Sequence, residues 1–241
     1  MGPIIGVTCP WSAETWGPNA KGCTYDYAGR AYGDAISRAG GVPLLIPTVL
    51  DERDMGAYAA QLLEVLDGLY FTGGGDRTLT SDKPLPLYAQ QPGRSRWEEV
   101  LMKLAYQRDI PCLGVCRGYQ MMAVAFGGTM DSVRWPDHKQ TEPYHIGIHD
   151  INPQGLLADL VGRETWCVNS IHVERVKTIP EGFCEAARTQ NGTIEAIYAM
   201  DKAFFLGTQF HPELMPEDPR SQSIFRRFIK AAESKKRSAK K

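Results

Sequence analysis

A cysteine flanked by glycines is the first feature that could do chemistry. In Gly114-Val115-Cys116-Arg117-Gly118, the thiol follows an apolar run typical of a buried strand and precedes a segment with helical spacing. A sharp strand-to-helix turn needs small neighbours, because it brings backbone segments close together. It also places the thiol at a helix N-terminus, where the helix dipole favours the reactive thiolate. A buried structural thiol between packing glycines explains the same five residues equally well.

A cysteine nucleophile needs a base and a group that orients the base. Among the five histidines, only His211 follows a strongly apolar run, at 204–210, and has a carboxylate two positions later. In extended backbone, residues i and i+2 face the same side, so we expect Glu213 beside the His211 imidazole. A lone strand-end histidine is more often a surface residue. Both patterns at the ends of expected parallel strands favour a catalytic pair, because sites in such sheets lie at the carboxyl ends of the strands.

Three consecutive glycines form a third feature, in Thr72-Gly73-Gly74-Gly75-Asp76 after the apolar residues 69–71. Glycines let the backbone turn its N–H groups toward a ligand, so this segment could cradle a phosphate or complete an oxyanion hole. GxGxxG and a Walker lysine are both absent from the sequence, which argues against nucleotide binding. The alternative is a flexible turn before the proline-rich loop expected at residues 77–93.

The elements that would position these residues alternate between strand and helix. Apolar runs predict strands at 4–8, 42–46, 69–71, 112–115 and 203–209, and shorter strands at 145–151, 165–169, 183–188 and 194–200. Helical spacing predicts helices at 25–39, 55–66, 94–107, 119–126 and 221–232. The alternation indicates a parallel sheet covered on both faces. We expect one domain over residues 1–241, with a solvated, frayed basic tail at 235–241.

Composition excludes several classes of protein. The 241 residues carry a net charge of -1, whereas a nucleic-acid-binding protein is usually basic. We therefore expect no nucleic-acid partner. No apolar run is long enough to span a membrane, and no secretory signal is visible, so we expect no membrane partner either. The six cysteines include no CxxC pair. We therefore expect no metal site, and free thiols in a reducing cytoplasm.

The segments GVCRGYQ, FTGGGD and GTQFHPE together resemble the class I glutamine amidotransferase family. The most similar branch is its stand-alone hydrolases, the γ-glutamyl-γ-aminobutyrate hydrolase-like proteins of peptidase family C26. Residues 27–47 resemble that branch's first helix and second strand, and residues 168–172 resemble its VNSxHHQ segment. The resemblance covers nearly the whole chain. It implies an α/β fold: a three-layer α/β/α, flavodoxin-like, mostly parallel sheet with additional antiparallel strands.

The resemblance also implies roles for single residues. Cys116 would be the nucleophile, His211 the base and Glu213 its orienting group. The backbone N–H groups of Arg117 and Gly74 would form the oxyanion hole, with the neighbouring glycines leaving the second donor uncertain by one position. Four further residues match positions around the glutamyl group of the substrate: Gln120, Asn169, Ser170 and His172.

One departure bears on specificity. The branch has a second His and then Gln, where this chain has Val173 and Glu174. The amine half of the substrate therefore stays open. Arg30, Arg94 and Arg96 are candidates to pair with the substrate α-carboxylate, although solvation is the usual state of a single arginine. The residues 77–93 and 11–16 could form the rim that selects the amine.

The implied activity is cysteine-dependent hydrolysis of a small γ-glutamyl-amine, as in polyamine or amine catabolism, with no cofactor. Three other interpretations stay open: a glutaminase subunit that supplies ammonia to a separate synthase, a non-catalytic binding or redox-sensing protein, and cleavage of poly-γ-glutamate tails. His211 and Glu213 argue against a sensor, which would need neither of them. The oligomeric state is likewise open, with a homodimer as one option.

Overall fold

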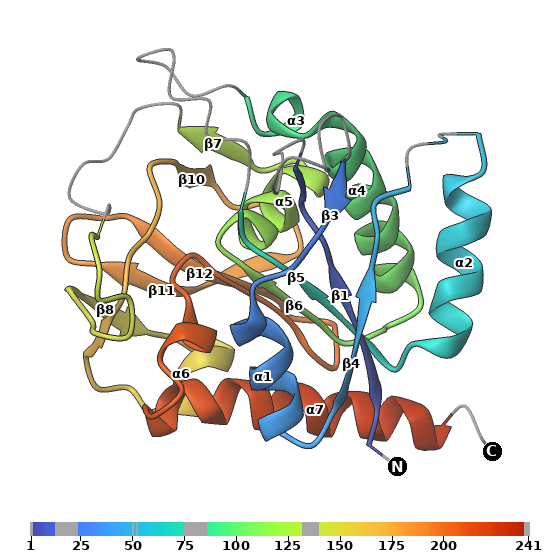
Figure 1. Ribbon diagram of the computed structural model, residues 1–241. Helices are drawn as coiled ribbons and strands as arrows, with labels where there is room; N and C mark the ends of the chain where they lie inside the picture. Colours follow the sequence, from blue (N-terminus) through green and yellow to red (C-terminus); the bar gives the residue numbers. More distant parts are fainter. Residues whose placement is uncertain are drawn as a thin grey trace, which may run out of the picture.

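The central sheet has nine strands among the residues that the structure describes. This computed structural model describes residues 2–12, 24–49, 51, 53–74, 86–131 and 140–238. The strands lie in the order β4-β1-β5-β6-β13-β12-β11-β8-β9 (Figure 1). Their bounds are β1 Ile4–Thr8, β4 Val42–Ile46, β5 Gly68–Phe71, β6 Cys112–Val115, β8 His149–Pro153, β9 Trp166–Val168, β11 Phe183–Thr189, β12 Ile194–Ala199 and β13 Phe205–Thr208.

One half of the sheet is parallel and the other antiparallel. Strands β4, β1, β5, β6 and β13 pair in parallel, and β12, β11, β8 and β9 continue the sheet with antiparallel pairs. Both β6 and β13 are buried along their whole length, as expected for parallel strands covered on both faces. Gly114 of β6 lies opposite Phe71 of β5 and Gly207 of β13. The residues that follow these three strands therefore meet at one edge of the sheet.

Two layers of helices cover the sheet. Side chains of α2 (Met55–Val65), α4 (Pro92–Gln107) and α5 (Arg117–Ala125) form one core, together with Leu69 and Phe71 of β5. Tyr70 points the opposite way, into a second core with α1 (Arg30–Arg38), α6 (Gly155–Val161) and α7 (Pro219–Ser238). Figure 1 shows α7 running past α1 and α6 along one side of the sheet. The α/β/α architecture predicted from the sequence, a parallel core with added antiparallel strands, is confirmed.

Several local predictions are wrong. The helix expected at 25–39 begins only at Arg30, because Tyr25–Asp26 (β3) pairs with Trp11–Ser12 (β2). The loop expected at 77–93 contains α3 (Leu87–Gln90) and the start of α4, whose Pro92 suits a first helical turn. The sequence analysis missed α6 and the pair β7 (Thr129–Asp131) with β10 (Arg175–Thr178). These elements are too short to produce a clear periodic pattern.

The basic C-terminal segment is not frayed as far as the structure describes it. Helix α7 continues through Ser238. Lys235 Nζ donates to Arg108 O, and Lys236 Nζ donates to Gly2 O at 2.9 Å and lies 3.1 Å from Asp67 Oδ2. These contacts attach the end of α7 to three other parts of the chain, at Gly2, Asp67 and Arg108. Residues 239–241 lie outside the described part of the chain. No helix within the described residues is long and apolar enough to cross a membrane.

Candidate active site

Cys116 lies on a sharp turn between β6 and α5. Its φ of 53° and ψ of -106° form a strained conformation that residues with a side chain rarely adopt. Its N–H donates to Thr208 O at 2.8 Å, which ties the turn to β13. A Cβ added to Gly118 would lie 2.2 Å from Phe71 O, and one added to Gly114 would lie 2.8 Å from Gly118 O. Both glycines are therefore required by the close approach of backbone segments.

His211 follows β13 and faces the Cys116 thiol. The two groups are close enough for Cys116 to raise the pKa of His211. Gly73, after β5, lies against both of them: a Cβ on Gly73 would be 3.0 Å from His211 Cε1 and 3.3 Å from Cys116 Cβ. The structure thus brings together residues that follow three neighbouring parallel strands, as expected for a site at the carboxyl ends of such strands. The thiol therefore has a candidate base beside it.

Glu213 lies on the other side of the imidazole. His211 Nδ1 and Glu213 Oε1 are 2.6 Å apart, and the two side chains are only 9% and 1% exposed. The pairing agrees with the prediction, but the expected extended backbone does not. Pro212–Leu214 forms a 3-10 turn (η2), which brings the carboxylate back toward the ring. Tyr70 Oη donates to Glu213 Oε2 at 3.5 Å.

These contacts set the charge of the imidazole. Burial alone would lower the pKa of His211, but the Glu213 carboxylate and Cys116 raise it to about 10. His211 is therefore protonated at neutral pH, and a positive imidazolium favours a thiolate beside it. Burial and the nearby Glu213 carboxylate raise the pKa of Tyr70 well above its usual value. The Tyr70 hydroxyl accordingly keeps its proton and donates a hydrogen bond to Glu213.

Arg94 does not have the role that the sequence suggested. Its side chain is fully buried, and its Nη2 donates to the backbone carbonyls of Thr72 at 2.8 Å and Gly73 at 3.1 Å. Its Nη1 donates to Gly74 O at 3.2 Å, and its Nε donates to Glu98 at 2.8 Å. The prediction that Arg94 pairs with a substrate carboxylate is therefore wrong. It fixes the conformation of the glycine segment instead.

The oxyanion-hole candidates are only partly available. The Gly73 N–H already donates to Tyr32 Oη at 3.0 Å. Gly74 adopts a φ of +85°, a conformation that glycine permits. Arg117 is the first residue of α5, and its guanidinium is turned to Glu98 and to Ser95 Oγ, the latter at 2.8 Å. The N–H groups of Arg117 and Gly74 stay the two candidate donors, and Gly75 lies outside the described residues.

Gln120 and His172 are joined through the backbone of Glu174. Gln120 Nε2 donates to Gln209 Oε1 at 3.1 Å and to Glu174 O at 3.2 Å. His172 Nδ1 donates to the same Glu174 carbonyl at 2.9 Å. The Glu174 carboxylate accepts from Gln90 Nε2 at 2.8 Å, and burial raises its pKa. Glu174, where the chain departs from the family pattern, is thus bound to both expected pocket residues.

The other two expected pocket residues are buried in the protein. Asn169 and Ser170 have no exposed surface. Asn169 is hydrogen-bonded to the backbone of His211, and Ser170 N donates to Gln140 Oε1 at 3.1 Å. Neither arrangement was visible in the sequence, because each partner lies more than twenty residues away along the chain.

A buried carboxylate that the sequence analysis missed, Glu195, lies beside the His172 imidazole. Glu195 is fully buried, with its oxygens 3.5 Å from His172 Nε2 and 3.7 Å from His149 Nε2. Burial would raise the pKa of Glu195, but the two nearby imidazoles lower it to about 2. No group of three or more His, Cys, Asp or Glu residues in the described part of the chain is arranged to hold a metal ion.

Of the expected rim at 11–16 and 77–93, residues 13–16 and 77–85 lie outside the described part of the chain. At the parts that are described, Gln91 Nε2 donates to Trp11 O at 2.8 Å, so the two rim segments touch. Arg30 and Arg96, the remaining candidates for the substrate carboxylate, are both exposed.

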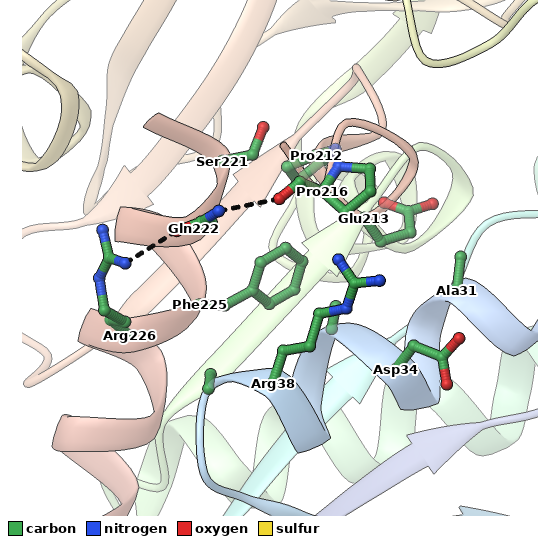
Figure 2. A pocket seen from close by; sticks show the side chains of 12 residues that line it. Ala31, Asp34, Arg38, Pro212, Glu213, Pro216, Ser221, Gln222, Phe225 and Arg226 are labelled. Atoms are coloured by element: carbon green, nitrogen blue, oxygen red, sulfur yellow. Dashed lines mark hydrogen bonds between the residues drawn. The ribbon is translucent and has the colours of Figure 1, made fainter. Parts of the chain in front are cut away.

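A cavity of about 350 Å³ lies between α1, η2 and α7 (Figure 2). Phe225 and Pro212 form part of its wall, and the Arg38 side chain extends into it. Glu213 lines this cavity, whereas Cys116 and His211 do not. It is therefore not the place where a substrate would meet the thiol.

The buried ion cluster beneath the glycine segment leads to a stability prediction. Glu98 is paired with both Arg94 and Arg117, and all three side chains are at most 3% exposed. We expect Arg94→Met to lower the free energy of unfolding by about 3–5 kcal/mol, because breaking one partner of a buried ion pair leaves charge and carbonyl groups uncompensated. Urea unfolding followed by circular dichroism measures this loss.

Arg96→Met is the control, since Arg96 is exposed on the same helix. It should change the free energy of unfolding by less than about 0.5 kcal/mol. A loss in Arg94→Met no larger than that of the control would contradict the role assigned to Arg94.

A comparison with known proteins now identifies the family. The model of the Peptidase C26 family matches residues 3–213. The chain belongs to the peptidase C26 family. Its C26 relatives include the gamma-glutamyl-gamma-aminobutyrate hydrolase PuuD of Escherichia coli, which is 30% identical over 96% of this chain and 94% of that protein. A candidate glutamine amidotransferase of Mycobacterium tuberculosis is 32% identical over 95% of this chain and 75% of that protein.

A solved structure supports the same fold for this C26 chain. A candidate GMP synthase component from Thermoplasma acidophilum superposes with a TM-score of 0.66, and the match covers 100% of this chain and 99% of the other. The two sequences are 19% identical, so the likeness concerns the fold alone. The chain is thus a C26 glutamine amidotransferase-like hydrolase with the three-layer architecture of that group.

Proposed function

We propose that the protein hydrolyses the γ-glutamyl amide bond of a small γ-glutamyl-amine, with γ-glutamyl-γ-aminobutyrate as the first candidate. The observation that carries the proposal is the buried chain of contacts from the Cys116 thiol through the His211 imidazole to the Glu213 carboxylate. A nucleophile, its base and an orienting carboxylate in this order suit acyl transfer through a covalent intermediate.

The proposed reaction has two steps. The Cys116 thiolate attacks the γ-carbonyl of the substrate, and the backbone N–H groups of Arg117 and Gly74 stabilise the oxyanion that forms. Protonated His211 gives its proton to the departing amine, which leaves a γ-glutamyl thioester and a neutral imidazole. His211 then takes a proton from water, the hydroxide attacks the thioester, and glutamate and the free thiolate are released.

Glu174 bears on the amine half of the substrate. It is bound through its backbone carbonyl to Gln120 and His172, the residues proposed for the glutamyl side of the pocket. A carboxylate disfavours a like charge nearby and favours a cationic group. Amines with anionic, neutral and cationic ends should therefore be compared directly.

We further propose a single catalytic domain in the cytoplasm, acting in amine catabolism. The five cysteines in the described part of the chain are free, as suits a reducing compartment. A glutaminase that supplies ammonia to a separate synthase is the second candidate, since the same thiol and imidazole would cleave glutamine and one relative bears an amidotransferase name.

The test is glutamate release by the purified protein from a panel of γ-glutamyl amides. The panel contains glutamine, γ-glutamyl-γ-aminobutyrate, and amides with neutral and cationic amine halves. We expect partner-independent release, with kcat/KM of at least about 10⁴ M⁻¹s⁻¹ for the best member. Folded protein that releases glutamate from none of them would move the assignment to a partner-dependent glutaminase or to a non-catalytic protein.

A further inference from the structure

Both N–H donors of the Asn169 side-chain amide are hydrogen-bonded to other residues of the protein. It follows β9 and has no exposed surface. Its Nδ2 donates to His211 O at 2.9 Å and to Tyr144 O at 2.8 Å, while its Oδ1 accepts the His211 N–H at 2.8 Å. A primary amide has two N–H donors, and both are used here. Asn169 therefore has no donor left for a substrate carboxylate.

The two hydrogen bonds from Asn169 to His211 lie just beyond the end of the sheet's own backbone hydrogen bonds. Strand β13 ends at Thr208, and Gln209 N–H still bonds to Glu195 O of the neighbouring strand. His211 lies beyond that ladder, and Asn169 binds both the N–H and the C=O of its main chain. The side chain of Asn169 thus substitutes for a missing neighbouring strand, and it does so at the residue whose ring must meet the thiol.

The segment that carries Asn169 is itself held on both sides. Gln140 N–H donates to Ser170 O at 2.8 Å, and Ser170 N–H donates back to Gln140 Oε1 at 3.1 Å. Ile148 N–H donates to Val168 O at 2.8 Å. Residues 168–170 consequently form a fixed support rather than a free wall of the substrate pocket.

We propose that Asn169 is a positioning residue that fixes the His211 main chain so that the imidazole stays in line between Cys116 and Glu213, rather than a ligand of the glutamyl group. The inference rests on the proposed function, in that it assigns His211 as the base. Displacement of a reacting group by about 1 Å can cost on the order of 10²-fold in rate, so a residue that touches no substrate can still control kcat.

The test compares Asn169→Ala and Asn169→Asp with the unchanged protein. Alanine removes all three bonds. Aspartate keeps the shape and one acceptor for the His211 N–H but sets a carboxylate against the carbonyls of His211 and Tyr144, so it remains informative if the alanine variant does not fold. We expect kcat for the best γ-glutamyl amide to fall by about 10–100-fold in each variant, with KM within about threefold of its original value.

A second readout needs no substrate. Alkylation of Cys116 by iodoacetamide at pH 7 reports the thiolate, which depends on the adjacent imidazolium. In both variants, Cys116 should be alkylated at least about fivefold more slowly than in the unchanged protein. A thermal unfolding midpoint measured separately confirms that each variant is folded. Asn152→Ala is the matched control, because Asn152 is an exposed asparagine of β8 outside the site, and it should change neither readout.

The outcomes separate the alternatives. A large rise in KM with unchanged kcat and unchanged alkylation would make Asn169 a substrate ligand and overturn the inference. Folded variants with both readouts unchanged would overturn it as well. If the unchanged protein cleaves no γ-glutamyl amide, the proposed function fails, yet the alkylation rates still decide whether Asn169 positions His211.

Discussion

Cys116→Ala is expected to lower kcat/KM for the best γ-glutamyl amide by at least about 10⁴-fold, because no other group can form the acyl-enzyme. The loss should appear almost entirely in kcat, since the thiol contributes little to binding. Glutamate release at saturating substrate, with folding checked by circular dichroism, measures it. The strained backbone at position 116 gives a further expectation: removing the thiol leaves the turn intact, because both flanking glycines remain.

Cys112→Ala is the matched control for this prediction. Cys112 lies four residues earlier on β6, and burial raises the pKa of its thiol well above the usual value, so it stays protonated and unreactive. The variant should retain activity within about threefold, and iodoacetamide should label Cys116 but not Cys112 in the unchanged protein. Residual turnover in Cys116→Ala comparable to that of Cys112→Ala would exclude Cys116 as the nucleophile.

The features that could be predicted from sequence are those that depend on residues close together in the chain. The strands at 4–8, 42–46 and 112–115 have the predicted bounds, because each is a short apolar run closed by glycine, proline or a polar residue. The turn at Cys116 was predictable for the same reason, since its two glycines lie within two residues of the thiol. The parallel order then brings the strand ends together.

The supporting contacts could not be predicted, because they join residues far apart in the chain. Thr8 Oγ1 donates to Glu98 across 90 positions, and Tyr70 reaches Glu213 across 143. No periodicity or motif relates such pairs. The role of Asn169 shows the limit of a motif match: the resemblance placed it near the active site, but only its hydrogen bonds reveal that it is bound to His211.

The His211–Glu213 pair was predicted for a reason that the structure corrects. Alternation along a strand suggested i and i+2 on one side, whereas the chain turns into η2 immediately after His211. Pro212 limits the backbone at the first position of that turn, so the Glu213 carboxylate curls back onto Nδ1. The spacing alone was sufficient to identify Glu213 as the partner of His211. Pro212 determines the backbone conformation that brings the two side chains into contact.

Glu213→Gln is expected to reduce kcat by about 10³–10⁴-fold while preserving the fold, by analogy with loss of the orienting carboxylate in other triads. The amide removes the negative charge of Glu213, which together with Cys116 raises the His211 pKa to about 10, so burial, which favours the neutral imidazole, is opposed less strongly. The imidazole then holds its proton less tightly, and the thiolate beside it is disfavoured. Iodoacetamide alkylation of Cys116 at pH 7 should slow accordingly, and kcat measures the catalytic loss.

The same charge gives the pH dependence of stability a definite sign. A raised pKa means that the folded protein holds the His211 proton more tightly than the unfolded chain, so this contribution is fully present below about pH 6.5 and is lost as the pH rises through about 10. In Glu213→Gln, the decline of unfolding free energy between these two pH values should be shallower. Urea unfolding at a series of pH values measures it.

Glu164→Gln provides the control for both measurements, because Glu164 is an exposed carboxylate between α6 and β9. It should leave kcat, the alkylation rate and the pH dependence of stability unchanged. If Glu213→Gln keeps kcat within about threefold of the original and alkylates as fast, the carboxylate does not orient or charge His211. The 2.6 Å contact between them would then be structural, and Cys116 would draw its reactivity from the helix dipole of α5 alone.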